Sequence, residues 1–194
     1  IEGGTYEVIE HLKDIRELIL HTSTPNVDIL PAHINLVAAE DELSDKEDRE
    51  YMLKTALDTV RDAYDYILID CSPSLGLMTI NSLTAADSVI IPIQCEYYAL
   101  EGLGKLLSTI KSIQKSYNPS LTYEGMLLTM FDPRLRLSNQ VAEEVRTHFQ
   151  NIVFKTVIQR NVKLGEAPSH GESIISYDAT SRGAENYLSL ASEI

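Results

Sequence analysis

The sequence predicts an α/β protein with a mostly parallel sheet and helices on both faces. Apolar runs of strand length alternate with segments whose apolar residues recur at helical spacing. Several of these runs are continuously apolar, which is typical of parallel strands buried on both faces. No repeat, linker or low-complexity segment interrupts the 194 residues, of which 44% are hydrophobic. We therefore expect residues 1–194 to form a single domain with a substantial core.

The first half of the chain predicts two helices and two strands. Residues 5–20 have the apolar spacing of a helix, with Thr5 as a plausible N-cap. A short strand follows over residues 27–30 and stops at Pro31. Residues Ser44 to Glu47 fit a capping box before a helix with its apolar stripe at Met52, Ala56, Val60 and Ala63. The apolar run 67–69 then predicts a buried strand that ends at Asp70.

The second half continues the alternation. Apolar runs predict strands over residues 88–93, 126–130 and 152–158. Helical spacing predicts a helix over residues 99–116 with Leu103, Leu106, Ile110 and Ile113 inward. A further helix starts at a capping Ser138 and places Val141, Val145 and Phe149 on one side. The last helix runs from about Ser181 and carries Ala184, Tyr187, Leu188 and Ala191.

Asp70 is the best candidate for chemistry. A buried parallel strand that ends in one acid delivers its carboxylate to the sheet edge where open α/β folds bind ligands. In phosphate chemistry such an acid helps to hold Mg²⁺, directly or through water. The alternative is an aspartate that merely caps the end of the strand.

Composition narrows the possible partners. The net charge of −13 opposes nucleic-acid binding by the surface as a whole but leaves room for a local basic patch. The segment 155–163 has three cationic residues and no acid. No apolar run approaches the roughly 20 residues of a membrane helix. Residues 186–194 also lack the basic amphipathic character of a membrane-binding helix, so we expect no membrane role. Cys71 and Cys95 lack metal-binding spacing, and we expect both to be reduced and buried.

Five segments together resemble one family. Asp65 to Gly76, Ile91 to Gly102, Gly125 to Met130, Arg160 to Gly171 and Ser181 to Glu185 closely resemble motifs of the ParA/Soj chromosome- and plasmid-partitioning ATPases, in the family's order. The resemblance covers nearly the whole chain. It implies a fold like that of P-loop NTPases and a cytoplasmic, nucleoid-associated ATPase. Such a protein forms a homodimer with ATP and Mg²⁺, binds DNA nonspecifically, and hydrolyses ATP under stimulation by a ParB-type centromere-binding partner.

The resemblance also implies roles for individual residues. Asp70 becomes the catalytic acid that positions Mg²⁺, and Ser72-Pro73-Ser74 becomes the switch loop that senses the γ-phosphate. The implied adenine pocket comprises Thr129, Met130, Asp132, Gln159 and Asn161. The implied DNA-binding cations are Arg160, Lys163 and Arg182, with Lys155 a weaker candidate. The segment Gln94 to Tyr98 is implied to form the dimer face or a conformational sensor.

A purely structural role remains open for most of these residues. Asp132 can cap a turn before Pro133, and Arg182 can be bonded near a helix start. The segment 94–98 can be a loop with a helix N-cap, and the cations can be solvated charges. Gln159 stands where relatives usually have proline, so backbone contacts to a base are expected to be less rigid.

The family's opening unit is missing from the sequence. No Gly-x-x-x-x-Gly-Lys-Ser/Thr occurs in the 194 residues. We expect a fragment, or else a natural truncation, without the first strand–loop–helix–strand unit. Residues 1–194 alone should not hydrolyse ATP, and they should expose strand edges and apolar surface. Two alternatives stay open: a noncatalytic ParA-like interaction module, and another cargo-positioning ATPase of the same superfamily.

Overall fold

The computed structural model describes residues 3–71 and 76–194, apart from the side chains of Glu40 and Glu101. It contains two compact units, which are described separately. The first unit comprises Ile1–Asp87 and Thr109–Leu121, and the second comprises Ser88–Ser108 and Thr122–Ile194. Within the described residues, the helices are all too short or too polar to cross a membrane.

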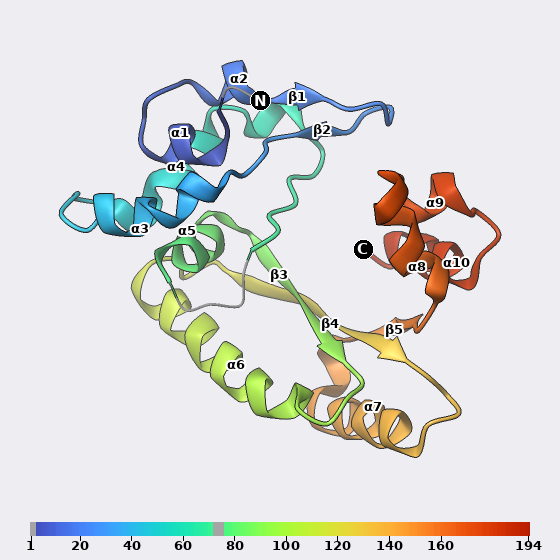
Figure 1. The fold of residues 1–194 in the computed structure, drawn as a ribbon. Coiled ribbons are helices and arrows are strands. Elements are labelled where there is room, and N and C mark those ends of the chain that lie inside the picture. The colour runs from blue at the N-terminus through green and yellow to red at the C-terminus, as the bar shows by residue number, and fades with distance from the viewer. Residues whose placement is uncertain (1–2, 72–75) are drawn as a thin grey trace. The chain divides into compact units, whose positions relative to one another are not determined.

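A three-stranded parallel sheet forms the centre of the second unit (Figure 1). Its strands are β3 (Ser88–Gln94), β4 (Thr122–Phe131) and β5 (Val153–Gln159), in the order β3-β4-β5. Both pairs of neighbours are parallel. The predicted α/β class and all three predicted strands of the second half are confirmed.

Apolar side chains are buried on both faces of this sheet. Leu127, Phe154 and Ile158 pack with Leu190 of helix α10 (Arg182–Ala191). Met126 and Leu128, which alternate with Leu127 and so point to the opposite face, are completely buried. Helix α7 (Arg136–Phe149) buries Val141 and Val145. The sheet is therefore a two-sided core element, as its continuous apolar runs predict.

Three helix predictions of the second half meet different outcomes. The predicted helix over 99–116 is confirmed as α6 (Ala99–Ser116). Ser181 caps α10, because its side chain accepts a hydrogen bond from the backbone N–H of Ala184. Tyr187 and Leu188 of α10 are nevertheless exposed. The cap predicted at Ser138 is wrong, since this residue lies inside α7.

Short elements that were not predicted follow β5: α8 (Val162–Glu166), η5 (Ala167–His170) and α9 (Ile174–Tyr177).

The first unit consists of short helices and a two-stranded antiparallel ribbon. The ribbon pairs β1 (Leu20–His21) with β2 (Asp28–Ile29). β2 lies within the strand predicted over residues 27–30, whereas β1 was not predicted. The helices are α1 (Thr5–Ile9), α2 (Ile15–Leu18), η1 (Ile34–Val37), α3 (Ala39–Glu42), η2 (Arg49–Tyr51), α4 (Met52–Asp58), η3 (Arg61–Ala63) and α5 (Leu77–Ala85).

Local capping breaks the helix predicted over residues 5–20 into α1 and α2. The N-cap of α1 is Gly4, not Thr5. Asp14 caps α2, because its side chain accepts a hydrogen bond from the backbone N–H of Arg16. Leu12, whose position fits the helical spacing of apolar residues, lies between the helices and is 64% exposed. A strong internal cap therefore overrides the apolar periodicity.

The capping box at Ser44 to Glu47 is also absent, because η2 precedes α4. Asn81 of α5, which is fully buried, joins these elements. Its Oδ1 accepts a hydrogen bond from the N–H of Leu53 at 3.0 Å, and its Nδ2 donates to the carbonyl of Arg49 at 2.8 Å. The amide thus satisfies one of the free N–H groups in the first turn of α4, the role predicted for the capping box.

The strand predicted to end at Asp70 is wrong. Residues 66–70 are irregular, and no backbone hydrogen bond joins them to another described residue. Tyr66 is 72% and Leu68 is 87% exposed. The segment lines an apolar groove of about 810 Å³. The physical reason is that a strand exists only against a hydrogen-bonded neighbour, and no described residue supplies one. Cys71, predicted to be buried, is consequently exposed, whereas Cys95 is buried as predicted.

Candidate functional site

The carboxyl ends of β3, β4 and β5 lie at one edge of the sheet, because all three strands are parallel. Backbone hydrogen bonds connect the loops that leave this edge. The N–H of Cys95, after β3, donates to the carbonyl of Thr129 at 2.9 Å. The N–H of Arg160, after β5, donates to the carbonyl of Phe131 at 2.9 Å. The end of β4 thus anchors both neighbouring loops.

The end of β4 is itself irregular. Met130 has a φ of 53°, in the left-handed region that non-glycine residues seldom adopt. The register between β4 and β5 also shifts between Leu128 and Phe131, so the pairing of these strands is irregular here. Met130 remains 37% exposed. The left-handed residue and the register shift therefore lie just before the loop that carries Asp132.

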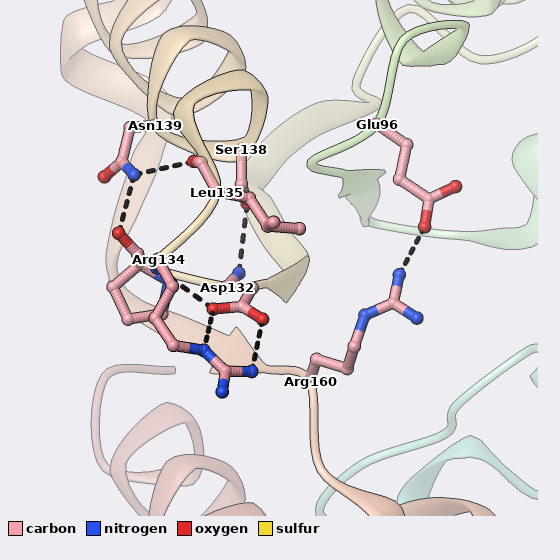
Figure 2. Close-up of polar contacts among 8 residues, drawn as sticks. Glu96, Asp132, Arg134, Leu135, Ser138, Asn139 and Arg160 are labelled. Atoms are coloured by element: carbon pink, nitrogen blue, oxygen red, sulfur yellow. Dashed lines mark hydrogen bonds and ion pairs between the residues drawn. The ribbon is translucent and has the colours of Figure 1, made fainter.

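Asp132 fixes an arginine at this edge (Figure 2). Its two carboxylate oxygens accept hydrogen bonds from Nε and Nη2 of Arg134, at 2.9 and 2.7 Å. One of these oxygens also accepts from the backbone N–H of Arg134 at 3.0 Å. These bonds lower the pKa of Asp132 to about 2. The carboxylate is buried, whereas the side chain of Arg134 is 86% exposed.

Two residues of α7 hold the loop that contains Asp132 (Figure 2). The Oγ of Ser138 accepts a hydrogen bond from the N–H of Asp132 at 3.0 Å. The Nδ2 of Asn139 donates to the carbonyls of Pro133 and Leu135, at 2.9 and 2.8 Å. Ser138 therefore caps the loop rather than the helix. The geometry therefore shows Asp132 in the structural role that the sequence left open, as the cap of the turn at Pro133.

Arg160 pairs with an acid from a distant part of the sequence. Its Nη2 lies 2.6 Å from Oε1 of Glu96, which follows β3 (Figure 2). The side chains of Arg160 and Glu96 are 49% and 51% exposed. The pair therefore connects the loops after β3 and β5 while both groups still contact solvent.

The other predicted site residues at the end of β5 and just after it also have hydrogen-bond partners. Gln159 donates its backbone N–H to Oδ1 of Asn186 at 3.1 Å. Asn161 caps α8, because its side chain accepts from the N–H of Lys163 at 2.8 Å. Lys163 lies 2.8 Å from Glu166 and 5.5 Å from the ring centre of Tyr177. The hydrogen bond to Glu166 raises the pKa of Lys163.

The remaining predicted cations are also half-exposed or exposed. Arg182, the first residue of α10, lies 3.0 Å from Glu185. This matches the alternative in which the arginine is bonded near a helix start. Lys155 in β5 is exposed, and its backbone N–H donates to Glu193 at 2.6 Å. The three predicted DNA-binding residues, Arg160, Lys163 and Arg182, thus each form an ion pair with one carboxylate.

Asp70 belongs to the first unit, where it lines the apolar groove. Its side chain is exposed. Among the described residues, no three His, Cys, Asp or Glu side chains gather in a metal-binding group. An exposed single carboxylate still fits Mg²⁺, which proteins hold through one or two carboxylates with waters and substrate phosphates. The predicted switch loop Ser72-Pro73-Ser74 lies outside the described residues.

Sequence reasoning missed Arg134 as a charged group of this edge. The signal was present, because an Asp followed two residues later by an N–H donor is the pattern of a turn in which the carboxylate binds the backbone. The spacing does not predict that the carboxylate of Asp132 also accepts hydrogen bonds from the guanidinium of Arg134.

Comparison with known proteins decides the family. A family model described as an AAA domain matches residues 2–123. The sporulation initiation inhibitor protein Soj of Bacillus subtilis is 55% identical over 194 residues, which is 100% of this chain and 77% of that protein. The chromosome partitioning protein ParA of Myxococcus xanthus is 49% identical over 100% of this chain and 69% of its own length. The chain belongs to the ParA/Soj family of partitioning ATPases. The resemblance inferred from its motifs is confirmed.

Solved structures agree with this ParA/Soj assignment. A cobyrinic acid a,c-diamide synthase from Mycobacterium smegmatis with bound ADP and magnesium matches 91% of this chain and 68% of that chain. Its TM-score is 0.78 at 35% identity. A putative plasmid partition protein from Borrelia burgdorferi bound to AMPPNP covers 98% of this chain and 71% of its own, with a TM-score of 0.79 at 25% identity.

Proposed function

We propose that this ParA/Soj-family chain acts in ATP-dependent partitioning of DNA, in a protein that dimerises with ATP, binds DNA nonspecifically and responds to a ParB-type partner. The observation that carries the proposal is the 55% identity to Soj across all 194 residues. The association with DNA would place the protein on the nucleoid.

The edge formed by β4 and β5 is the proposed adenine site. Asn161 uses its Oδ1 for the cap of α8, which leaves its Nδ2 to donate to a base. The amide side chain of Gln159 offers both a donor and an acceptor, as the edge of adenine does. Met130 is partly exposed and apolar, and so can contact the flat face of a base. Thr129 and Asp132 would shape the site, since their carbonyl and carboxylate already have partners.

Asp70 is the proposed Mg²⁺ ligand and the catalytic carboxylate of this chain. Mg²⁺ would neutralise the charge on the nucleotide phosphates. The contribution of Asp70 would be one carboxylate that holds the ion directly or through water. The solved relatives with ADP or an ATP analogue and magnesium support this assignment.

Arg160, Lys163 and Arg182 are the proposed DNA contacts, and the exposed Arg134 joins them. Each is at least 44% exposed. A net charge of −13 means that binding must depend on such local cations. Each phosphate contact should contribute about 0.9 to the slope of log K against log salt concentration.

The test is salt-dependent binding to a fluorescent random-sequence duplex, with and without MgATP. We expect binding that weakens with KCl, and a slope that falls by about 0.9 for each of Arg160→Gln, Lys163→Gln and Arg182→Gln. Lys155→Gln serves as the comparison for a weaker candidate. Absence of binding at low salt, or an unchanged slope in all the variants, would contradict the DNA-binding role.

A further inference from the structure

Arg160 differs from the other proposed DNA contacts in the origin of its acidic partner. Lys163 and Arg182 pair with acids three residues further along their own helices. Arg160 pairs with Glu96, which is 64 residues away and belongs to the loop after β3 (Figure 2). This ion pair therefore exists only while the two loops keep their places at the sheet edge.

The backbone arrangement sets up this pair. The residue before Glu96, Cys95, is buried and donates its N–H to Thr129 of β4. The N–H of Arg160 donates to Phe131 of the same strand. Both loops are thus anchored on β4, and their side chains meet at 2.6 Å.

We propose that Glu96 competes with DNA phosphate for Arg160. This inference rests on the proposed function, because it assumes that Arg160 contacts DNA. While the carboxylate is 2.6 Å from the guanidinium, the pair is close to neutral and attracts a phosphate weakly. Because both groups are half-exposed, the pair is weak enough for a phosphate to displace the carboxylate. DNA binding then releases the loop after β3 from the loop after β5.

The direct test compares the DNA affinities of Glu96→Gln and the wild type, measured by the fluorescence anisotropy of the labelled random-sequence duplex. The assay uses about 0.1 M KCl, where the Debye length is about 10 Å. We expect two- to fivefold tighter binding, which is about the range that exposed ion pairs span. The salt slope should change little, because Arg160 contacts one phosphate in both proteins and the variant removes only the competing carboxylate.

Two variants separate competition from a change in net charge. Glu96→Asp keeps the charge but shortens the side chain, so it should also bind DNA more tightly than the wild type. Glu143→Gln removes the same charge from an exposed position of α7 that has no ion pair among the described residues. Its effect on affinity should be clearly smaller than that of Glu96→Gln.

A double-mutant cycle makes the inference specific to the pair. In an Arg160→Gln background, Glu96→Gln should no longer tighten binding beyond the effect of Glu143→Gln. Circular dichroism would confirm that each variant is folded.

Each outcome has a defined meaning. Equal effects of Glu96→Gln and Glu143→Gln, or the same gain with and without Arg160, would overturn the competition while leaving DNA binding intact. Failure of every protein to bind DNA at low salt would remove the proposed DNA-binding role, and the competition with it.

Discussion

Replacing the buried Asn81 by alanine should strongly destabilise the first unit. The amide bonds two backbone groups outside its own helix, the N–H of Leu53 and the carbonyl of Arg49. Alanine leaves both without this partner in a region where Asn81 is fully buried. A buried polar group that loses its partner costs about 1–3 kcal/mol. Alanine regains about 0.5 kcal/mol of helix propensity, so we expect a net loss of about 2–3 kcal/mol in the free energy of unfolding.

Urea denaturation followed by circular dichroism measures this loss. With a slope of about 2 kcal/mol per molar urea, the midpoint should fall by about 1–1.5 M. Asn81→Asp should be similarly destabilised, because it keeps an acceptor for Leu53 but turns an oxygen toward the carbonyl of Arg49.

The matched control is Thr84→Val in the same helix. The Oγ1 of Thr84 is buried and has no hydrogen-bond partner among the described residues. Removing this hydroxyl at nearly constant volume should leave the midpoint unchanged or raise it. The reasoning is refuted if Asn81→Ala shifts the midpoint no further than Thr84→Val does.

Three further predictions concern the charge of Asp132, the exposed segment 66–70 and the hydrolysis of ATP. Asp132 has a pKa of about 2 in the folded state and an ordinary value of 3.8, so its contribution to stability is present above about pH 4 and lost as the pH falls toward 2. The stability difference between the wild type and Asp132→Asn, measured with urea at pH 7 and pH 3, should therefore shrink at pH 3. Leu68→Lys should reduce self-association in light scattering, because Leu68 is 87% exposed, and unchanged association would contradict this. A polypeptide of residues 1–194 contains no Gly-x-x-x-x-Gly-Lys-Ser/Thr phosphate loop, so it should release no radiolabelled phosphate from ATP, and turnover like that of an active relative would refute the prediction.

The parts of the fold that sequence patterns predict best are those with strong local signals. β3, β4, β5 and α6 follow from continuous apolar runs and helical spacing, and α10 begins at its predicted cap Ser181. The family followed from long motifs in series, and the comparison with Soj confirms it. The family resemblance implied that residues 129–132 and 159–161 belong to one site, and the parallel strands β4 and β5 do end at the same edge of the sheet.

The failures share one cause, which is dependence on distant partners. The apolar run before Asp70 has strand propensity, but the described residues offer it no hydrogen-bonded neighbour, and it stays irregular and exposed. Ser138 has the chemistry of a helix cap, yet its hydroxyl is used by the backbone of Asp132.

The order of apolar and polar residues along the chain is enough to determine which segments can become strands and helices, and which family they belong to. Whether a segment does become a strand, and whether a cation is free or neutralised, depends on groups that folding brings together. Glu96 and Arg160 show this most clearly, because 64 residues separate them in sequence and 2.6 Å in space. Hydrogen bonds and ion pairs act over a few ångströms, so only the tertiary structure could decide these outcomes.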